Sequence, residues 1–486
     1  MAQGSSRQVG SPHIGSIVQS PHKPGRAPIT QASGFQPCDF VPMCEQLTYH
    51  GGPVMHTSTT HAIYWLPTGY TSGDGMPPYD ATYQSLIAQY FTDLAVASGT
   101  ADNVYGVDSQ YYDDPDHAHA TTNQTYGGSY VDTTTAFPAD GCSDPTGVAA
   151  HCLTDDQLQT EIEHVIGVMG WPKGTSNIYF LLTPEGVESC TDASLLAACS
   201  NIDYCAYHGF YDSGSNTVIY ANQPYPKLAN DPSLECGFGE YPNGGDADEE
   251  LNVLSHEHRE ATNDPTLDAW YADDTLYEGS DQCAWYFGKE SGLDGARYNQ
   301  TINGHHYDLQ LEWSNDGNKC VGSYPAPATP KISPTHGVVG QPIGIKTKGP
   351  EKVTEITFNG TTADLSLVGK KLTAVVASGT TTGPVQLTWW AGGTVDGPPF
   401  TVDPSPAPTI KSFKPISVAT GATVTVSGTG FWGTSAVKVN GADVQSFAVK
   451  SASKLSFVVG GGNSTGQVSV TTPGGTVVSA GTLTIT

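Results

Sequence analysis

The stretch LNVLSHEHREA, residues 251–261, places His256 and Glu260 four positions apart in a segment that predicts a helix. Residues at positions i and i+4 lie on one face of a helix, so both side chains can point at one metal ion. Glu257, next to the histidine, can reach a water molecule on that metal. This is the logic of the HExxH zinc helix, with glutamate in place of the second histidine. The alternative is an amphipathic helix whose charged face is simply solvated.

The ends of this helix and two further helices are also marked in the sequence. Asp246 or Asp248 can cap its start, and Pro265 ends it. A second helix is predicted after Asp80, and a third follows a capping box of Thr154 and Gln157.

Three apolar runs predict buried strands at residues 61–66, 177–182 and 217–221. Because these strands alternate with helices along the chain, the sequence favours an α/β (α+β) layer domain.

The ten cysteines all lie before residue 325 and never form a CxxC pair, which argues against zinc knuckles and redox motifs. They predict up to five disulfides in an oxidising compartment, with 38/44, 142/152 and 190/199 as local pairs. The expected location is therefore extracellular, secreted or at the cell surface. Residues 1–30 contain no apolar run that could act as a signal peptide, so a replaced leader or another export route is expected.

Charge is distributed unevenly along the chain. Residues 326–486 carry 6 acidic and 11 basic side chains, which leaves 42 acidic and 9 basic ones, a net charge of −33, for residues 1–325. Such an acidic front part disfavours nucleic acid and anionic membranes as partners, and no 18-residue apolar stretch predicts a membrane span. A solvated acidic surface is the plain interpretation.

Composition divides the chain into four predicted parts. Residues 1–35 are rich in Gly, Ser, Pro and Gln and predict a mobile arm, followed by a disulfide-rich domain at 36–323. Two proline-rich linkers then precede similar segments of short alternating strands, which predict all-β, immunoglobulin-like sandwiches at 329–403 and 407–486. The strand TVTVS at 423–427 is the clearest of the repeat.

The two sandwich segments resemble a known domain family. The phrases Gly428-Thr429-Gly430-Phe431 and Thr472-Pro473-Gly474-Gly475 are similar to the immunoglobulin-like IPT/TIG domain, strongly in the second copy and more weakly in the first. Such modules commonly serve as spacers or binding arms, so the fold alone assigns them no activity.

The front part resembles a second family through phrases in a fixed order: YHGGPV at 49–54, PNG at 242–244, VLSHE at 253–257 and NDP at 263–265, followed by AWY at 269–271. Over roughly residues 45–322 it resembles the phosphate-induced protein 1 (EXORDIUM-like) family and its secreted bacterial relatives. Plant members are known as extracellular growth-related proteins, and the family is similar to metallopeptidase folds through its HExxE helix. The resemblance implies a metallopeptidase-like fold with one zinc ion.

A zinc site needs a third protein ligand. The resemblance implies Glu278, in an acidic phrase before a cysteine, with Asp281 as a hydrogen-bonding partner of the site. Asp264 continues the i, i+4, i+8 line and is an alternative. His258 lies about 200° around the helix from His256, so a position at the surface or behind the ligands is expected.

Other histidines and acidic residues offer weaker candidates. His208, in a phrase similar to the family, and three histidines near the first strand could contact substrate; these are His50, His56 and His61. The Asp-rich loop at 113–119 could bind calcium but matches no defined ligand spacing.

These residues predict a secreted zinc-dependent hydrolase of metallopeptidase type, in which His256, Glu260 and Glu278 bind the metal and Glu257 is the catalytic general base. Its partner would be a peptide or protein substrate. The alternatives are a non-catalytic protein that binds extracellular polysaccharide or envelope and retains the fold, and a structural adhesin whose repeats do the binding.

Overall fold

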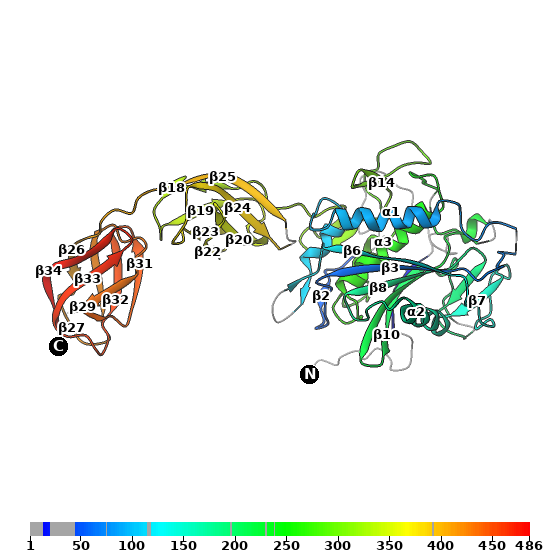
Figure 1. Ribbon diagram of the computed structural model, residues 1–486, viewed down its shortest axis with the longest axis horizontal. Coiled ribbons are helices and arrows are strands. Elements are labelled where there is room, and N and C mark those ends of the chain that lie inside the picture. Colours follow the sequence, from blue (N-terminus) through cyan, green and yellow to red (C-terminus); the bar gives the residue numbers. More distant parts are fainter. Residues whose placement is uncertain are drawn as a thin grey trace. The chain divides into compact units, whose positions relative to one another are not determined.

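The computed structural model describes residues 44–73, 75–113, 118–194, 197–228, 231–237, 239–390 and 393–486, together with the backbone of the strand His13–Gln19. The chain forms two compact units, Met1–Pro325 and Ala326–Thr486 (Figure 1). Most of the arm predicted at residues 1–35 lies outside the described residues. Within it, His13–Gln19 is a strand that pairs with the main sheet, which the sequence did not predict.

The first unit is built on a six-stranded mixed sheet. Its strands, in spatial order, are β1 (His13–Gln19), β10 (Tyr204–Ser213), β11 (Asn216–Gln223), β8 (Asn177–Leu182), β3 (Ser58–Trp65) and β6 (Gln124–Asp132). The four strands from β11 to β6 run parallel, whereas β10 is antiparallel to β11 and β1 is antiparallel to β10. The three strands predicted from the sequence are β3, β8 and β11, at the centre of this sheet.

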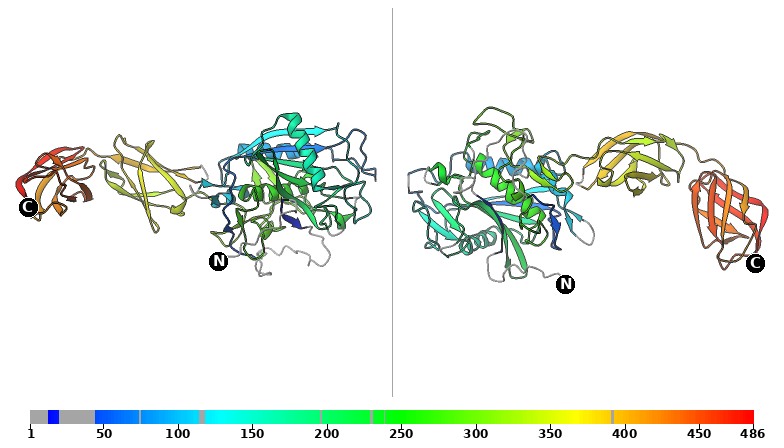
Figure 2. Two further views of the ribbon diagram at one scale, coloured as in Figure 1. Left: turned by 90° about the horizontal axis from the view of Figure 1, so that it is seen from below. Right: turned by 180° about the vertical axis from the view of Figure 1, so that it is seen from behind.

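Helices cover both faces of the sheet. Side chains alternate along a strand, so Ala62 and Tyr64 of β3 pack in one core with helices α1 (Tyr83–Val96) and α3 (Ala247–Asn263). Ile63 and Trp65 pack on the opposite face against α2 (Asp155–Met169). In the left view of Figure 2, α2 and α3 lie on opposite sides of the sheet. The arrangement is a three-layer α/β/α domain, which confirms the predicted α/β class.

Short strand pairs complete this unit. They are β2 (Thr48–Tyr49) with β12 (Trp270–Tyr271), β4 (Tyr112–Asp113) with β5 (Ala118–His119), β7 (His151–Thr154) with β9 (Val187–Cys190), β13 (Gln300–Ile302) with β14 (His305–Tyr307), and β15 (Glu312–Ser314) with β16 (Lys319–Val321).

The predicted cap of α2 is present, whereas the predicted cap of α3 is not. The capping box of Thr154 and Gln157 is present at α2. The start of α3 is not capped by a side chain, because Asp246 instead accepts hydrogen bonds from Tyr225 and Lys227. Asp248 instead accepts the backbone N–H of Asn243, in the loop before the helix. The prediction that Asp246 or Asp248 caps the helix is therefore wrong.

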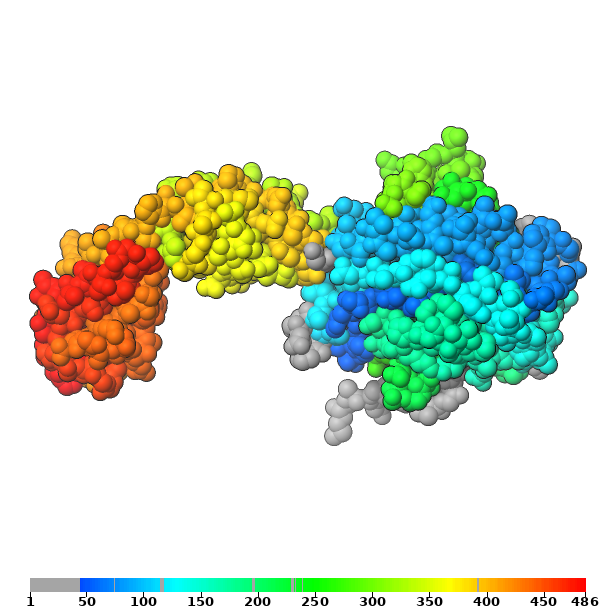
Figure 3. Space-filling view, in the orientation of Figure 1, coloured from blue at the N-terminus to red at the C-terminus, as the bar shows by residue number. Residues whose placement is uncertain are grey.

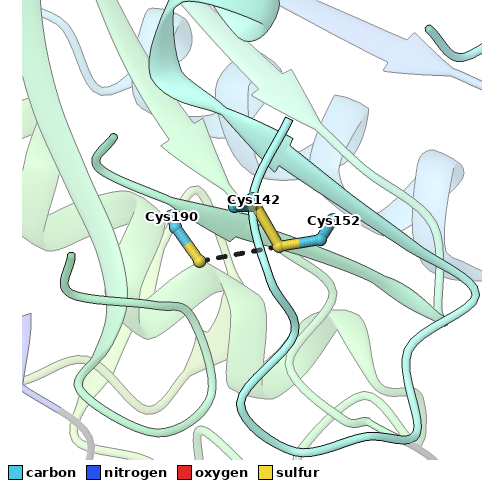
Figure 4. Close-up of side chains that lie close together, drawn as sticks. All are labelled: Cys142, Cys152 and Cys190. Atoms are coloured by element: carbon cyan, nitrogen blue, oxygen red, sulfur yellow. Dashed lines mark hydrogen bonds between the residues drawn. A yellow bond between two sulfur atoms is a disulfide. The ribbon is translucent and has the colours of Figure 1, made fainter. Parts of the chain in front are cut away.

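Four disulfides lie within the described residues. Cys142–Cys152 and Cys190–Cys199 are the predicted local pairs, and Cys205–Cys236 and Cys283–Cys320 close longer loops of 31 and 37 residues. Cys44 is also disulfide-bonded, and its predicted partner, Cys38, lies outside the described residues. The Sγ atoms of Cys152 and Cys190 are 3.6 Å apart (Figure 4). Both sulfurs are already in disulfides, so this group is not a metal site.

The second unit contains two β-sandwiches of the same strand order. The first sandwich has a four-stranded sheet with the order β17 (Lys331–Ser333), β19 (Pro342–Lys346), β23 (Lys371–Val375) and β22 (Asp364–Val368). Its second sheet has the order β18 (His336–Gly337), β25 (Thr394–Val402), β24 (Gly383–Trp389), β20 (Val353–Phe358) and β21 (Thr361–Thr362). The second sandwich has a four-stranded sheet with the order β26 (Thr409–Lys414), β28 (Thr423–Thr429), β32 (Lys454–Val458) and β31 (Ser446–Ser451). Its other sheet has the order β27 (Ser417–Val418), β34 (Gly475–Ile485), β33 (Gly466–Thr472), β29 (Ala436–Val439) and β30 (Ala442–Asp443). Each sandwich has its own apolar core, and the predicted strand 423–427 lies in β28.

Because the cores are separate, deletion of residues 326–486 should leave the first unit folded with its disulfides intact. We expect its melting temperature to change by less than about 2 °C, since changes outside a unit's core typically cost under about 0.5 kcal/mol. Calorimetry of the truncated and full chains, with mass spectrometry of the disulfide-linked peptides, measures this. A first unit that no longer unfolds cooperatively would show that the boundary is misplaced.

Candidate metal centre

Helix α3, which carries the HExxE stretch, is buried along its entire length. All 17 of its residues are buried, although eight of them, all between Asp248 and Glu260, are acidic, basic or histidine residues. The helix lies between the sheet and later segments that include β15. A helix with one solvated charged face is therefore ruled out, and each charged group must find its partner inside the protein.

His256 and Glu260 approach each other as their i, i+4 spacing predicts. The Nε2 atom of His256 lies 3.0 Å from Oε1 of Glu260, and both side chains are fully buried. Glu257 is the third member of a group whose candidate ligand atoms all lie within 4.8 Å of one another. The helix thus gathers an imidazole and two carboxylates at one place.

His208, on strand β10, meets the same carboxylates from the sheet side. Its Nδ1 lies 3.3 Å from Glu257 Oε2 and 3.8 Å from Glu260 Oε2, and its Nε2 lies 3.8 Å from Glu278 Oε1. His208, Glu260 and Glu278 form a second group within 4.8 Å, so Glu260 belongs to both groups. We refer to the five residues His208, His256, Glu257, Glu260 and Glu278 as the carboxylate cluster.

The carboxylate cluster combines the four residues predicted from the sequence with one that was not predicted as a ligand. Glu278 is grouped with His208 rather than with His256. His208 stands in the otherwise apolar and aromatic run YCAYHGFY of β10, and a polar residue in a buried strand is the signal that could have found it.

Burial and mutual repulsion perturb the pKa values in the cluster. Burial lowers the pKa of His208, but the carboxylates of Glu278 and Glu257 outweigh it and raise the pKa to about 9. Burial also lowers the pKa of His256, which Glu260 and Asp281 raise well above its usual value. Burial and then Asp281 raise the pKa of Glu260 well above the ordinary range. A bound divalent cation would favour the ionised carboxylates, since it is the largest local charge in such a site.

The donor set fits zinc, which accepts imidazole nitrogen and carboxylate oxygen. Among the described residues, Oε1 of Glu257 and Oε2 of Glu260 are buried and have no hydrogen-bond partner. Buried oxygens without a partner are costly, and a metal ion would satisfy them.

Gln310 holds the ring of His256. Its Nε2 lies 2.6 Å from His256 Nδ1 and donates to Ser280 O at 2.9 Å, while its Oε1 accepts from the Trp285 N–H at 3.2 Å. These contacts hold the ring with its Nε2 towards Glu260.

Asp281 and Asp264 support the cluster in different ways. The Asp281 N–H donates to Glu260 Oε1 at 3.0 Å, and its Oδ1 lies 3.5 Å from His256 Nε2, so it contacts both residues of the helix pair. Asp264 Oδ1 accepts the backbone N–H groups of Asp268 and Ala269, which fixes the turn after the helix.

His258 lies on the opposite side of the helix from His256, but not at the surface. It is fully buried, with Nε2 2.9 Å from Ser58 Oγ and Nδ1 3.1 Å from Tyr105 OH. Burial, together with Arg259, lowers its pKa to about 3. The expectation of a position at the surface or behind the ligands is wrong, because sheet and helix α1 cover this face of α3.

Arg259 anchors the helix to the later part of the unit. Its buried guanidinium forms an ion pair with Glu312 of β15 and donates to Leu311 O at 3.3 Å. Glu312 also accepts from Ser280 Oγ at 2.6 Å, in the segment that carries Glu278. The pair thereby connects α3 with two of the segments around the cluster.

The three histidines near the first strand contact other groups. His50 stacks on Tyr271, His56 pairs with Asp113 at 3.1 Å, and His61 packs against Trp171. In the Asp-rich loop considered for calcium, residues 114–117 lie outside the described residues.

Comparison with known proteins identifies one module. Residues 408–485 match the IPT/TIG domain family, so the second sandwich is an immunoglobulin-like domain of this type. No curated protein matches the chain.

Several solved structures show a limited likeness. A surface glycan-binding protein, SGBP-B from a xyloglucan utilization locus in Bacteroides uniformis, is 20% identical, with a TM-score of 0.19 over 33% of this chain and 50% of that one. PbSGBP-B from Prevotella bryantii is 17% identical, with a TM-score of 0.18 over 33% and 42%. The plexin A4 extracellular region is 14% identical, with a TM-score of 0.25 over 56% and 24%. The chain spans half or less of these proteins, and at such TM-scores we draw no functional conclusion from them.

Among the helices in the described part of the chain, none combines the length and the hydrophobicity that a membrane crossing needs.

Proposed function

We propose that the first unit is a zinc-dependent hydrolase of metallopeptidase type that acts on peptide or related amide bonds. The observation that carries this proposal is the carboxylate cluster, in which two histidines and three glutamates from separate segments meet in the buried interior. The resemblance of residues 45–322 to the EXORDIUM-like family, with its metallopeptidase-like HExxE helix, supports it. The disulfides suit an oxidising compartment, so we place the protein outside the cytosol, secreted or at the cell surface.

The residues of the cluster have distinct proposed roles. His256 and Glu260 hold the metal, and either Glu278, as the resemblance implies, or His208, as its position suggests, completes the set. Zinc supplies Lewis acidity, which polarises a carbonyl group and makes water easier to deprotonate. Glu257 accepts the water proton and passes it to the leaving amine. Asp281 orients the helix pair through its contacts with both members.

A second candidate function is a non-catalytic, metal-stabilised protein that binds extracellular polysaccharide or envelope. Two features favour it. The side chains of the cluster are at most 2% exposed, which restricts access by substrate. Carboxylate ligands also donate more charge than imidazoles, so the zinc would be a weaker Lewis acid.

The first sandwich is proposed to be of the same IPT/TIG type as the second, because the strand order of its two sheets is the same. In both candidate functions these modules serve as spacers or binding arms.

Metal analysis of the purified protein tests the site. We expect one zinc per chain, and we expect His256→Ala and Glu260→Ala each to weaken zinc binding by more than the roughly 10- to 100-fold that loss of an outer partner costs. Zinc added at 100 times its dissociation constant should stabilise the metal-free parent by about 2.7 kcal/mol. His164→Ala is the matched control, since this histidine lies on α2 with its side chain 46% exposed. A parent that neither contains zinc nor is stabilised by it would reject the proposal.

A further inference from the structure

Strand β10 links the carboxylate cluster to the edge of the main sheet. His208 points from β10 towards α3, while its neighbour Tyr207 packs in the core on the α2 side. Among the described residues, β10 pairs with β11 on one side and, on the other, only with β1, the seven-residue strand near the start of the chain. Without β1, strand β10 would be the edge of the sheet.

The pairing of β1 with β10 is irregular opposite His208. Ile14 pairs with Gly209 and Ile17 with Tyr207, so two residues of β1 lie opposite His208. Such a β-bulge breaks the ladder locally, and bulges are common beside functional sites. β1 also contacts the 3₁₀ turn η4 (Asp281–Cys283), which carries Asp281 of the site. The first strand of the chain thus runs past the residues that surround the cluster.

We propose that the β10 edge binds an extended polypeptide as an added antiparallel strand, and that His13–Gln19 is a self-strand that occupies this edge until it is displaced. The identification of the polypeptide as substrate rests on the proposed hydrolase function. An extended peptide added to a sheet edge is held by main-chain hydrogen bonds, whatever its sequence. A peptide in the place of β1 would pass opposite His208, beside the carboxylate cluster.

The short length and irregular pairing of β1 allow a peptide to displace it from β10. The strand is short, its pairing is interrupted by register shifts after Ile14 and after Val18, and each regular ladder bond contributes little net stability. A tethered strand nevertheless competes with a free peptide at an effective concentration of the order of mM. The intact chain should therefore bind free peptides weakly, and loss of β1 pairing should expose a site that binds them. Residues 214–216, at the turn between β10 and β11, are exposed, and this green segment lies at the surface in Figure 3.

Hydrogen exchange of the full chain tests the pairing. The double substitution Ile14→Pro/Val18→Pro removes two N–H donors from β1, and proline fits poorly in a paired strand. We expect amides of Tyr204–Phe210 that face β1 to exchange at least about tenfold faster, with the amides that face β11 unchanged. Ser6→Pro/Gln8→Pro, outside the strand, is the matched control. Unchanged exchange in β10 would overturn the proposal.

Peptide binding tests the use of the edge. A fluorescent peptide with the sequence of residues 11–21, SPHIGSIVQSP, should bind the Ile14→Pro/Val18→Pro variant, restore the slow exchange of β10, and bind the parent at least about tenfold more weakly. Should the proline variant not fold, a chain with a protease site inserted after Ser20 and cleaved in the folded state takes its place. Failure of the peptide to bind either protein would overturn the proposal. Hydrogen exchange and peptide binding are both measured without zinc. A negative result in either would therefore not contradict the proposed zinc site, and a protein that binds no zinc could still give a positive result in both.

Discussion

The Glu257→Gln variant should hydrolyse peptides about 10²- to 10⁴-fold more slowly than the parent and should keep its zinc. Glu257 Oε2 lies 3.3 Å from His208 Nδ1, and its Oε1 is buried without a hydrogen-bond partner among the described residues. The substitution preserves the size of the side chain and removes its basicity. A proton acceptor is thereby lost, while the proposed ligands His256 and Glu260 remain in place. Casein or a peptide library, with metal analysis of the same sample, provides the measurement.

Glu250→Gln is the matched control for this experiment. Glu250 is fully buried on the same helix, and burial raises its pKa to about 8, so it is mostly neutral at pH 7 and resembles glutamine. Its substitution should leave the rate unchanged. An unchanged rate in Glu257→Gln would reject the assigned general base. An inactive parent that contains zinc would favour the binding function instead.

The Arg259→Met variant should lose about 3–5 kcal/mol of unfolding free energy, because it leaves Glu312 buried without its cationic partner. Both side chains of this pair are fully buried, and burial raises the pKa of Glu312 while Arg259 lowers it. Urea unfolding of the chain, followed by a probe in the first unit, measures the loss. The double variant Arg259→Met/Glu312→Leu should recover much of it, since no unpaired charge is left.

Arg297→Met is the matched control for the ion pair. The Arg297 side chain is 37% exposed and pairs with Glu240, so its removal should cost at most about 1 kcal/mol. A similar small loss in Arg259→Met would show that the buried pair does not hold α3 in place.

Local sequence patterns predicted the central strands, the three helices and the two short-range disulfides. Each of these depends on neighbours within a few residues, such as the 3.6-residue spacing of α1 or the capping box of α2. The disulfides that join cysteines 31 and 37 residues apart were not predictable, because only the folded chain brings them together.

In the carboxylate cluster, too, local contacts were predictable from the sequence and long-range contacts were not. The pair His256 and Glu260 follows from helix geometry, whereas His208 and Gln310 reach the helix from 49 and 54 residues away. His258 was expected near the surface because a helix usually has one exposed face. That rule fails here, because the sheet and helix α1 cover the face of α3 that carries His258. The strand β1 was missed because its Gly- and Ser-rich surroundings predict an arm, and pairing with β10 stabilises it as a strand.

The burial of α3 on all sides also has a consequence for synthesis of the chain on the ribosome. Arg259 is translated 53 residues before Glu312, and His256 is translated 54 residues before Gln310. During that interval the charge of Arg259 has no Glu312 to pair with, and the His256 ring lacks its contact with Gln310. The helix therefore cannot yet be buried on all sides. We expect the sheet and its α2 face to form first and the metal centre to be assembled last, after residue 312 has left the exit tunnel. Zinc uptake would then report completed folding of the whole unit.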